Sequence, residues 1–143
     1  MLKSQVRRKE KTKKQKNKDE ADKWFSLYIR LSNADWRGYV QCYTCPKIAH
    51  YKDYMQNGHF ISRKSSTLRF SESNCRVQCY ACNVMLKGNY IKYTMRLIKE
   101  HGKRFVEKLI EKGKETHQFT EQELGEIANK YKEKVINMSN YEK

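Results

Sequence analysis

The hydrophobic pattern is helical at both ends of the chain and changes to a short period in the middle. Residues 19–32 carry one apolar stripe at helical spacing, formed by Trp24, Leu27, Tyr28 and Leu31. This stripe predicts an amphipathic helix packed on a core, followed by a turn at residues 33–38. Residues 39–82 alternate over only a few positions, and Tyr39-Val40 and Phe60-Ile61 indicate brief strands.

Helical periodicity returns after residue 88. The first apolar face there is formed by Ile91, Thr94, Leu97 and Ile98. Gly102 can end that helix as a C-cap, and a second apolar stripe from Phe105 to Ile110 predicts a helix ending near Gly113. Thr120 and Glu123 have the spacing of a capping box that opens a third helix. The pattern predicts an α+β fold with an N-terminal helix, a small β-rich core and about three C-terminal helices.

Composition limits the size of that core. The chain has 143 residues, of which 38% are hydrophobic and 33% are charged, and its mean hydropathy is −1.01. A chain of this length fits one domain. Because a small core stabilises a fold only weakly, we expect a metal or disulfides to reinforce it.

The charge is strongly positive and is concentrated at the N-terminus. The formal net charge is +15, and residues 1–18 contain nine Lys and Arg against one Glu. We expect residues 1–18 to be a disordered basic arm, which is either a solubilising tail or a grip on the DNA backbone. The arm's expected phosphate contacts are Arg7, Arg8, Lys13 and Lys14. Residues 19–143 would then form a single domain, with a metal core at 39–88 and a helical extension at 89–138.

A polyanionic partner follows from this charge, and nucleic acid is the first expectation. An anionic membrane is less favoured, because no run approaches the ~20 apolar residues of a membrane span. The N-terminus has no apolar segment typical of a signal peptide. We therefore expect a cytoplasmic protein.

The cysteines are arranged as two metal-binding knuckles. Cys42 and Cys45 form one C-x2-C pair, and Cys79 and Cys82 form the other. Four thiolates make a closed tetrahedral site, which predicts structural zinc rather than catalytic zinc. In a cytosolic chain metal ligation is favoured over disulfides. Cys75 is left over, and we expect it to be a small buried hydrophobic residue.

Candidate chemistry lies between and beside the knuckles. His59 stands in the run NGHFISR at residues 57–63, Asn74 precedes the second knuckle, and Asn83 follows it directly. This arrangement resembles HNH endonucleases, which have a His after a short strand, an Asn about 15 residues later, and a knuckle followed by His or Asn. The resemblance implies a zinc-stapled ββα-metal core (HNH, or His-Me finger).

A more specific resemblance covers most of residues 20–135. The runs WFSLYIR at 24–30, GYV at 38–40 and GHFISR at 58–63, the two knuckles and the helix past Tyr93 are similar to the NinG (Rap) family of lambdoid phage recombination proteins. This resemblance implies a structure-specific DNA endonuclease acting on branched DNA such as Holliday junctions and D-loops, in the host cytoplasm. A homodimer remains open, since a symmetric junction resolvase would cut two strands.

On the family pattern His59 is the general base, Asn74 holds the hairpin and the loop that carries the histidine, and Asn83 binds a catalytic Mg²⁺ or Mn²⁺. A neutral imidazole, with a reference pKa of about 6.5, can take a proton from water. A divalent cation can polarise the phosphate and stabilise the leaving oxygen.

Gly58 departs from the HNH pattern, because many such enzymes carry Asp or His there as a second metal ligand. Asp53 and Glu72 are alternatives by sequence proximity. Basic residues around His59 are expected to contact phosphates: Arg63, Lys64 and Arg69. The competing interpretation is a non-catalytic zinc-stapled nucleic-acid-binding module.

Overall fold

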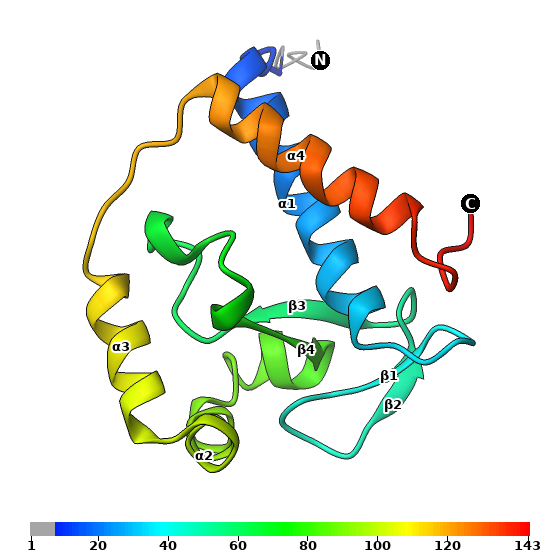
Figure 1. Ribbon diagram of the computed structural model, residues 1–143, viewed down its shortest axis with the longest axis vertical. Helices are drawn as coiled ribbons and strands as arrows, with labels where there is room; N and C mark the ends of the chain where they lie inside the picture. The colour runs from blue at the N-terminus through cyan, green and yellow to red at the C-terminus, as the bar shows by residue number, and fades with distance from the viewer. Residues whose placement is uncertain (1–7) are drawn as a thin grey trace, which may run out of the picture.

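The computed structural model describes residues 8–143 (Figure 1). Arg7, one of the predicted phosphate contacts, lies outside the described residues. Two helices, α1 and α4, lie side by side above two small sheets, and α2 and α3 cover the opposite side of the lower half (Figure 1). The predicted α+β class is confirmed.

Helix α1 spans Lys13–Ser32 and therefore begins within the segment predicted to be disordered. The prediction for residues 13–18 is wrong because local caps and tertiary contacts order them. The Thr12 hydroxyl accepts a hydrogen bond from the Gln15 amide at 3.2 Å. The Asn17 side chain donates to the carbonyl of Glu121 at 3.1 Å, which attaches this end of α1 to α4. Lys13 and Lys14 are thus exposed residues of a helix, and Arg8 is exposed before it.

The strands form two antiparallel hairpins. Strand β1 (Tyr39–Gln41) pairs with β2 (Ile48–His50), and β3 (Met55–His59) pairs with β4 (Cys75–Cys79). Phe60 and Ile61 were expected in a strand, but β3 ends at His59. The amide of Ile61 instead donates to the Asn74 side chain at 2.8 Å, so that side chain takes the place of a partner strand.

Short and long helical segments fill the rest of the chain. The long β3–β4 loop contains the 3-10 turns η1 (Ser66–Leu68) and η2 (Glu72–Asn74), and the π-helical turn η3 (Ala81–Met85) follows β4. Then come α2 (Tyr90–His101), α3 (Lys103–Gly113) and α4 (Glu121–Ile136). All three helix-end predictions are confirmed: Gly102 ends α2 at φ 88°, α3 ends at Gly113, and Thr120 and Glu123 form the capping box of α4.

The core consists of two hydrophobic clusters. The first joins α1, α4 and the β3–β4 hairpin, and its aromatic centre is Phe25 against Tyr131, with ring centroids 4.9 Å apart. The second lies between the β3–β4 loop and helices α2 and α3, around Phe60 and Tyr93. His59 precedes Phe60, so it lies where the two clusters meet.

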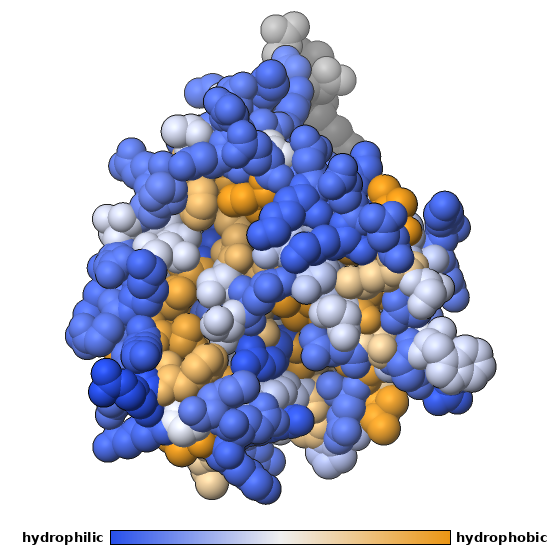
Figure 2. Space-filling model, in the orientation of Figure 1, coloured by the Kyte–Doolittle hydropathy of each residue, from blue (hydrophilic) through white to orange (hydrophobic). Residues whose placement is uncertain are grey.

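The surface is mostly hydrophilic. Figure 2 shows polar side chains over most of one face, with apolar side chains gathered beside α3 and over α2. Among residues 8–143 no helix is both long and apolar enough to cross a bilayer.

Candidate functional site: a cysteine cluster beside a basic pocket

The four knuckle cysteines converge on one point. The sulfurs of Cys42, Cys45, Cys79 and Cys82 all lie within 4.8 Å of one another. A tetrahedral zinc with Zn–S bonds of about 2.3 Å requires sulfur separations of about 3.8 Å. The Sγ atoms of Cys45 and Cys79 are 3.7 Å apart, so the donor set and its spacing fit the predicted zinc.

Hydrogen-bond donors surround these sulfurs. The amide of Cys79 donates to Cys42 Sγ at 3.3 Å, and the Asn89 side chain donates to Cys82 Sγ at 3.7 Å. Burial opposes ionisation of the Cys42 thiol, but the backbone N–H groups of Cys79 and Thr44 outweigh it and lower its pKa to about 7. Donors of this kind stabilise thiolates, the form that binds metal.

Cys75 is separate from the cluster, as predicted. It is 2% exposed and lies in the first hydrophobic core. Burial raises the pKa of its thiol to about 12, which leaves it protonated and unreactive. Cys75 is therefore a core residue.

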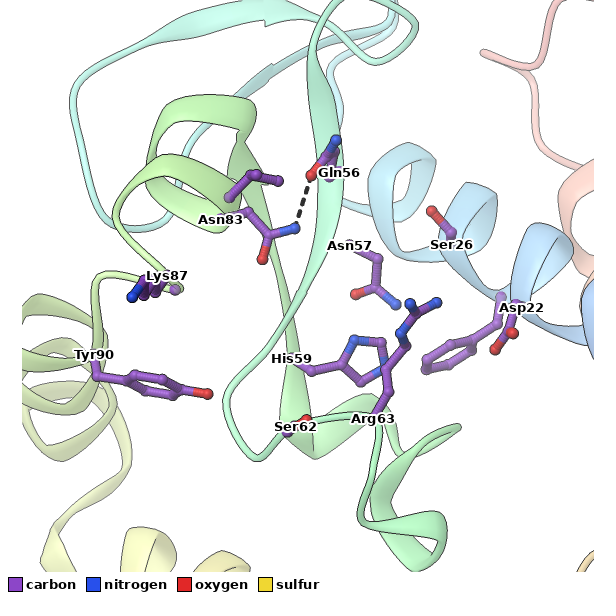
Figure 3. Close-up of a pocket in the computed structure, with 13 residues that line it drawn as sticks. Asp22, Ser26, Gln56, Asn57, His59, Ser62, Arg63, Asn83, Lys87 and Tyr90 are labelled. Carbon is purple, nitrogen blue, oxygen red and sulfur yellow. Dashed lines mark hydrogen bonds between the residues drawn. The ribbon is translucent and has the colours of Figure 1, made fainter.

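A pocket of about 510 Å³ lies between α1 and the segment that follows the second knuckle. Its walls come from α1, β3, the loop after β3, η3 and the start of α2. Polar and charged side chains that line it are Asp22, Ser26, Gln56, Asn57, His59, Ser62, Arg63, Asn83, Lys87 and Tyr90. The His59 ring lies centrally, with Asp22 and Ser26 of α1 on one side and Lys87 and Tyr90 on the other (Figure 3).

His59 is held in one tautomer by the backbone. Its Nε2 lies 2.9 Å from the carbonyl oxygen of Arg69. A carbonyl only accepts, so Nε2 carries the hydrogen and the neutral ring keeps its lone pair on Nδ1. Burial lowers the pKa of His59, and the nearby positive charges of Arg63 and Arg69 act in the same direction. The imidazole is therefore neutral at neutral pH.

Asn74 fastens the loop that follows His59. It is fully buried, its Oδ1 accepts from the Ile61 amide at 2.8 Å, and its Nδ2 donates to the Ile61 carbonyl at 2.8 Å. The Asn74 carbonyl also accepts from the amide of Phe60 at 2.8 Å. One side chain thus fixes both backbone groups of the residue two positions after the histidine.

Asn83 lies on η3 across the pocket from His59. Its Nδ2 donates to Gln56 Oε1 at 2.8 Å, which orients the amide and leaves Oδ1 facing the pocket (Figure 3). It lies within η3 rather than at its N-cap, so a capping role, the alternative to metal binding, does not apply. The oxygen of Asn83 is free to meet a cation or a donor group.

Gly58 has a packing reason to be glycine. A Cβ at this position would lie 2.1 Å from the Gln78 Oε1 atom. Gln78 is fully buried, and its Nε2 is held by Thr44 and by the Gly88 carbonyl. The space that a larger side chain at position 58 would need is therefore occupied by Gln78.

The expected substitutes for that ligand lie elsewhere. Asp53 is exposed in the β2–β3 turn, and Glu72 is 4.0 Å from Lys134 on the α4 side. Neither lines the pocket. Within the described residues the carboxylate that does line it is Asp22.

Asp22 is committed to Arg69, which corrects the prediction that Arg69 is a phosphate contact. The Arg69 guanidinium binds Asp22 through two hydrogen bonds of 2.9 and 2.6 Å, and its side chain is only 16% exposed. A buried bidentate pair holds its arginine in place. Arg63 and Lys64 are exposed, as a phosphate contact requires, and Arg63 lines the pocket.

Sequence reasoning missed several pocket residues. Asp22 is 37 positions from His59 in a helix whose stripe predicted only packing, and no local motif marks it. Asn57 could have been found, because alternation in a strand puts it on the same face as His59. Lys87 and Tyr90 follow the second knuckle within eight positions and could have been found by proximity to Asn83.

Fold and site together define a small α+β protein with a cluster of four cysteines that can hold a metal ion, beside a basic pocket. The family model described as "Bacteriophage Lambda NinG protein" matches residues 2–142, so the chain belongs to the NinG family. Protein ninG of Escherichia phage 933W is 28% identical over 122 residues, and Protein ninG of Enterobacteria phage VT2-Sa matches to the same extent.

These alignments cover 85% of this chain but only 57% of each relative, so the chain spans little more than half of their length. No solved structure matches the chain at a significant level.

Proposed function

We propose that this chain is a metal-dependent DNA endonuclease of the HNH type that hydrolyses phosphodiester bonds in branched DNA. The observation that carries the proposal is the pairing of two groups in one pocket. His59 offers an uncommitted Nδ1 lone pair, and Asn83 offers an uncommitted oxygen. The order β3, β4 and a short helix matches the ββα arrangement that the sequence resemblance implies.

His59 is suited to act as a general base. Its neutral ring takes a proton from water at Nδ1 while Nε2–H stays on the Arg69 carbonyl, which holds the ring in place. The resulting hydroxide attacks phosphorus, and the bond to the 3′ oxygen breaks. Asn74 acts as a positioning residue through the loop that it fastens.

The pocket fits a hard cation that is held largely by its substrate. Asn83 Oδ1 is the protein ligand, and Asp22 contributes little because Arg69 occupies it. Mg²⁺ commonly keeps several waters and completes its shell with substrate phosphates. Bound there, Mg²⁺ or Mn²⁺ would supply charge to stabilise the leaving oxygen. Because Gly58 supplies no ligand, cation binding depends on DNA.

A basic surface supports DNA as the substrate. Arg63 and Lys87 line the pocket, Lys64 lies beside it, and all three are exposed. Phosphate contacts of this kind position the backbone without reading its sequence. The choice of branched DNA, Holliday junctions and D-loops, is carried over from the resemblance, and binding as a homodimer belongs to the same proposal.

The test compares the purified protein with His59→Ala on labelled four-way junction, D-loop and duplex DNA, in Mg²⁺, Mn²⁺ or EDTA. We expect cleavage of branched DNA that requires metal and falls by about 10²–10⁴-fold in the variant. His117→Ala is the matched control, because it removes an exposed histidine whose ring contacts Glu123 and Phe119 and lies outside the pocket.

Binding without cleavage in either metal would overturn the enzyme assignment. It would favour the second candidate, a non-catalytic zinc-stapled nucleic-acid-binding module. That candidate explains the charge and the cysteines but leaves the fixed tautomer of His59 without a use.

A further inference from the structure

A run of exposed apolar side chains follows the second knuckle. Val84, Met85 and Leu86 are 47%, 70% and 58% exposed, although each is large and hydrophobic. They are followed at once by Lys87, which is also exposed. Three consecutive apolar side chains in water are unfavourable, so such a feature marks a contact with a partner.

This run is held in place by hydrogen bonds at the cysteine cluster. Cys82 lies in the same short helix, its carbonyl accepts from the Gly88 amide at 2.9 Å, and its sulfur accepts from Asn89. The Gly88 carbonyl in turn accepts from the buried Gln78 side chain at 2.9 Å. Lys87 and Asn89 have φ values of 50° and 47°, and such left-handed non-glycine residues persist only where surrounding contacts enforce them.

The run also forms part of the rim of the His59 pocket. Val84, Lys87, Gly88 and Tyr90 all line that pocket, so Met85 and Leu86 lie on the segment between lining residues. Figure 3 shows Lys87 and Tyr90 on the side of His59 opposite to α1. A ligand in the pocket on this side meets Val84, the first residue of the apolar run.

We propose that Met85 and Leu86 form a wedge that packs against base faces exposed where strands of branched DNA separate. The proposal rests on the proposed function and names how its substrate would be selected. A continuous duplex hides its base faces by stacking, whereas a branch point exposes them. Apolar side chains of Met and Leu are known to insert at disrupted base steps, and nearby cations then hold the backbone.

Charge favours DNA over a protein as the occupant. Lys87 and Lys92 flank the wedge, and Arg63 lies across the pocket, all exposed. A second copy of this chain would bring the same positive charge to that face. DNA fits both the apolar side chains and the positive charges around them, because it offers apolar base faces beside phosphates.

The test measures binding rather than cleavage, so it uses the His59→Ala background. Met85→Ser/Leu86→Ser is compared on a four-way junction with 2-aminopurine at the branch point and on duplex DNA of equal length. We expect junction affinity to fall on the order of tenfold to a hundredfold and the 2-aminopurine signal change to be lost. Duplex affinity should stay within about twofold, because phosphate contacts are untouched.

Ile91→Ser/Met95→Ser is the matched control. It removes two side chains of α2 that are 78% and 66% exposed but lie outside the apolar run that follows the second knuckle. We expect this variant to keep the junction preference. All four positions are exposed, so zinc content and helicity should be unchanged.

Equal loss of affinity for junction and duplex, or no loss, would overturn the wedge. So would a change from dimer to monomer in sedimentation caused by Met85→Ser/Leu86→Ser, because a second copy would then be the occupant. The proposed function is tested separately by cleavage with the unmodified chain. A junction preference that depends on Met85 and Leu86 without any cleavage would leave the wedge standing and remove the nuclease.

Discussion

The cysteine cluster and the His59 pocket lie at opposite ends of the β3–β4 hairpin, but they differ in the kinds of donor group that they contain. The cluster has four identical donors from two knuckles, packed into a closed site. The pocket has donors of several kinds from five segments of the chain, and one side is open. A closed site has a single geometry that serves stability, whereas an open site leaves part of its coordination to the substrate.

The residues around the two sites also differ in how they shift the pKa values of the side chains there. Backbone amides favour the charged form of Cys42 and lower its pKa to about 7, whereas burial raises the pKa of Cys45 to about 12 and also raises that of Cys79. Around His59 burial and arginines favour the neutral form. The cluster therefore needs a bound metal ion to hold all four thiols as thiolates, whereas the pocket keeps His59 neutral with its own residues.

Removing one cysteine of the cluster is expected to have the largest effect. Cys79→Ser should release the metal and lower the unfolding free energy by about 5 kcal/mol or more, because metal binding and folding are coupled. Zinc content and thermal unfolding measure this.

Cys75→Ser is the matched control, since it changes the other end of the same strand. It should keep the zinc and lose about 1–2 kcal/mol for a polar atom in the core. Equal effects of the two substitutions would contradict a structural metal.

Asn74→Ala tests whether the position of His59 depends on the hydrogen bonds that Asn74 makes to the loop after it. Losing the bonds to Ile61 should destabilise the fold by about 2–3 kcal/mol. Cleavage should fall by about 10²-fold through misplacement of His59. Cleavage kinetics at a temperature where this variant and its control are both folded measure the loss of activity.

Asn140→Ala removes a side chain that also donates to two backbone carbonyls, those of Leu31 and Asp35, but lies outside the pocket. It should cause a similar loss of stability and leave cleavage unchanged. If both variants lose activity in proportion to stability, Asn74 has no positioning role.

Gly58→Ala tests whether the Gln78 side chain fills the space beside Gly58. Its Cβ would collide with Gln78, so we expect a loss of about 1–3 kcal/mol in unfolding free energy. In a Gln78→Ala background the same substitution should cost much less. Chemical denaturation of the four proteins in this cycle gives the coupling, and additive effects would contradict the collision.

The smallest expected effect is on the pH dependence of cleavage. Because the pKa of His59 is lowered, its proton leaves at lower pH than from a free histidine. Activity should therefore rise with pH and reach its plateau with a midpoint below the reference value of about 6.5. An acid limb at or above that value, with the protein still folded by circular dichroism, would contradict His59 as the base.

The sequence predicted what depends on spacing and missed what depends on packing. Two C-x2-C pairs and a capping box are local, and the cluster and the start of α4 agree with them. Arg69 was assigned to phosphate because it is basic and near His59. Its true partner, Asp22, is brought to it by the docking of α1, which no local pattern describes.

The onset of α1 was missed for the same reason. A run of lysines reads as disordered when taken alone, and its contact with Glu121 lies 104 positions away. Likewise, the apolar stripe of α1 predicted burial, but Tyr131, which packs against Tyr28 of that stripe, comes from the last helix. Long-range pairing was not readable from one sequence.

In polymer terms, a metal at the cluster closes a loop that begins after Cys45 and ends at Cys79. For a loop of roughly 33 residues the chain-entropy relation gives a stabilisation of about 3–4 kcal/mol from restricting the unfolded chain. Doubling the length of such a loop changes that figure by only about 0.6 kcal/mol. The segment around η1 could therefore lengthen or shorten at little entropic cost, while Asn74 at the end of η2 keeps its register with His59.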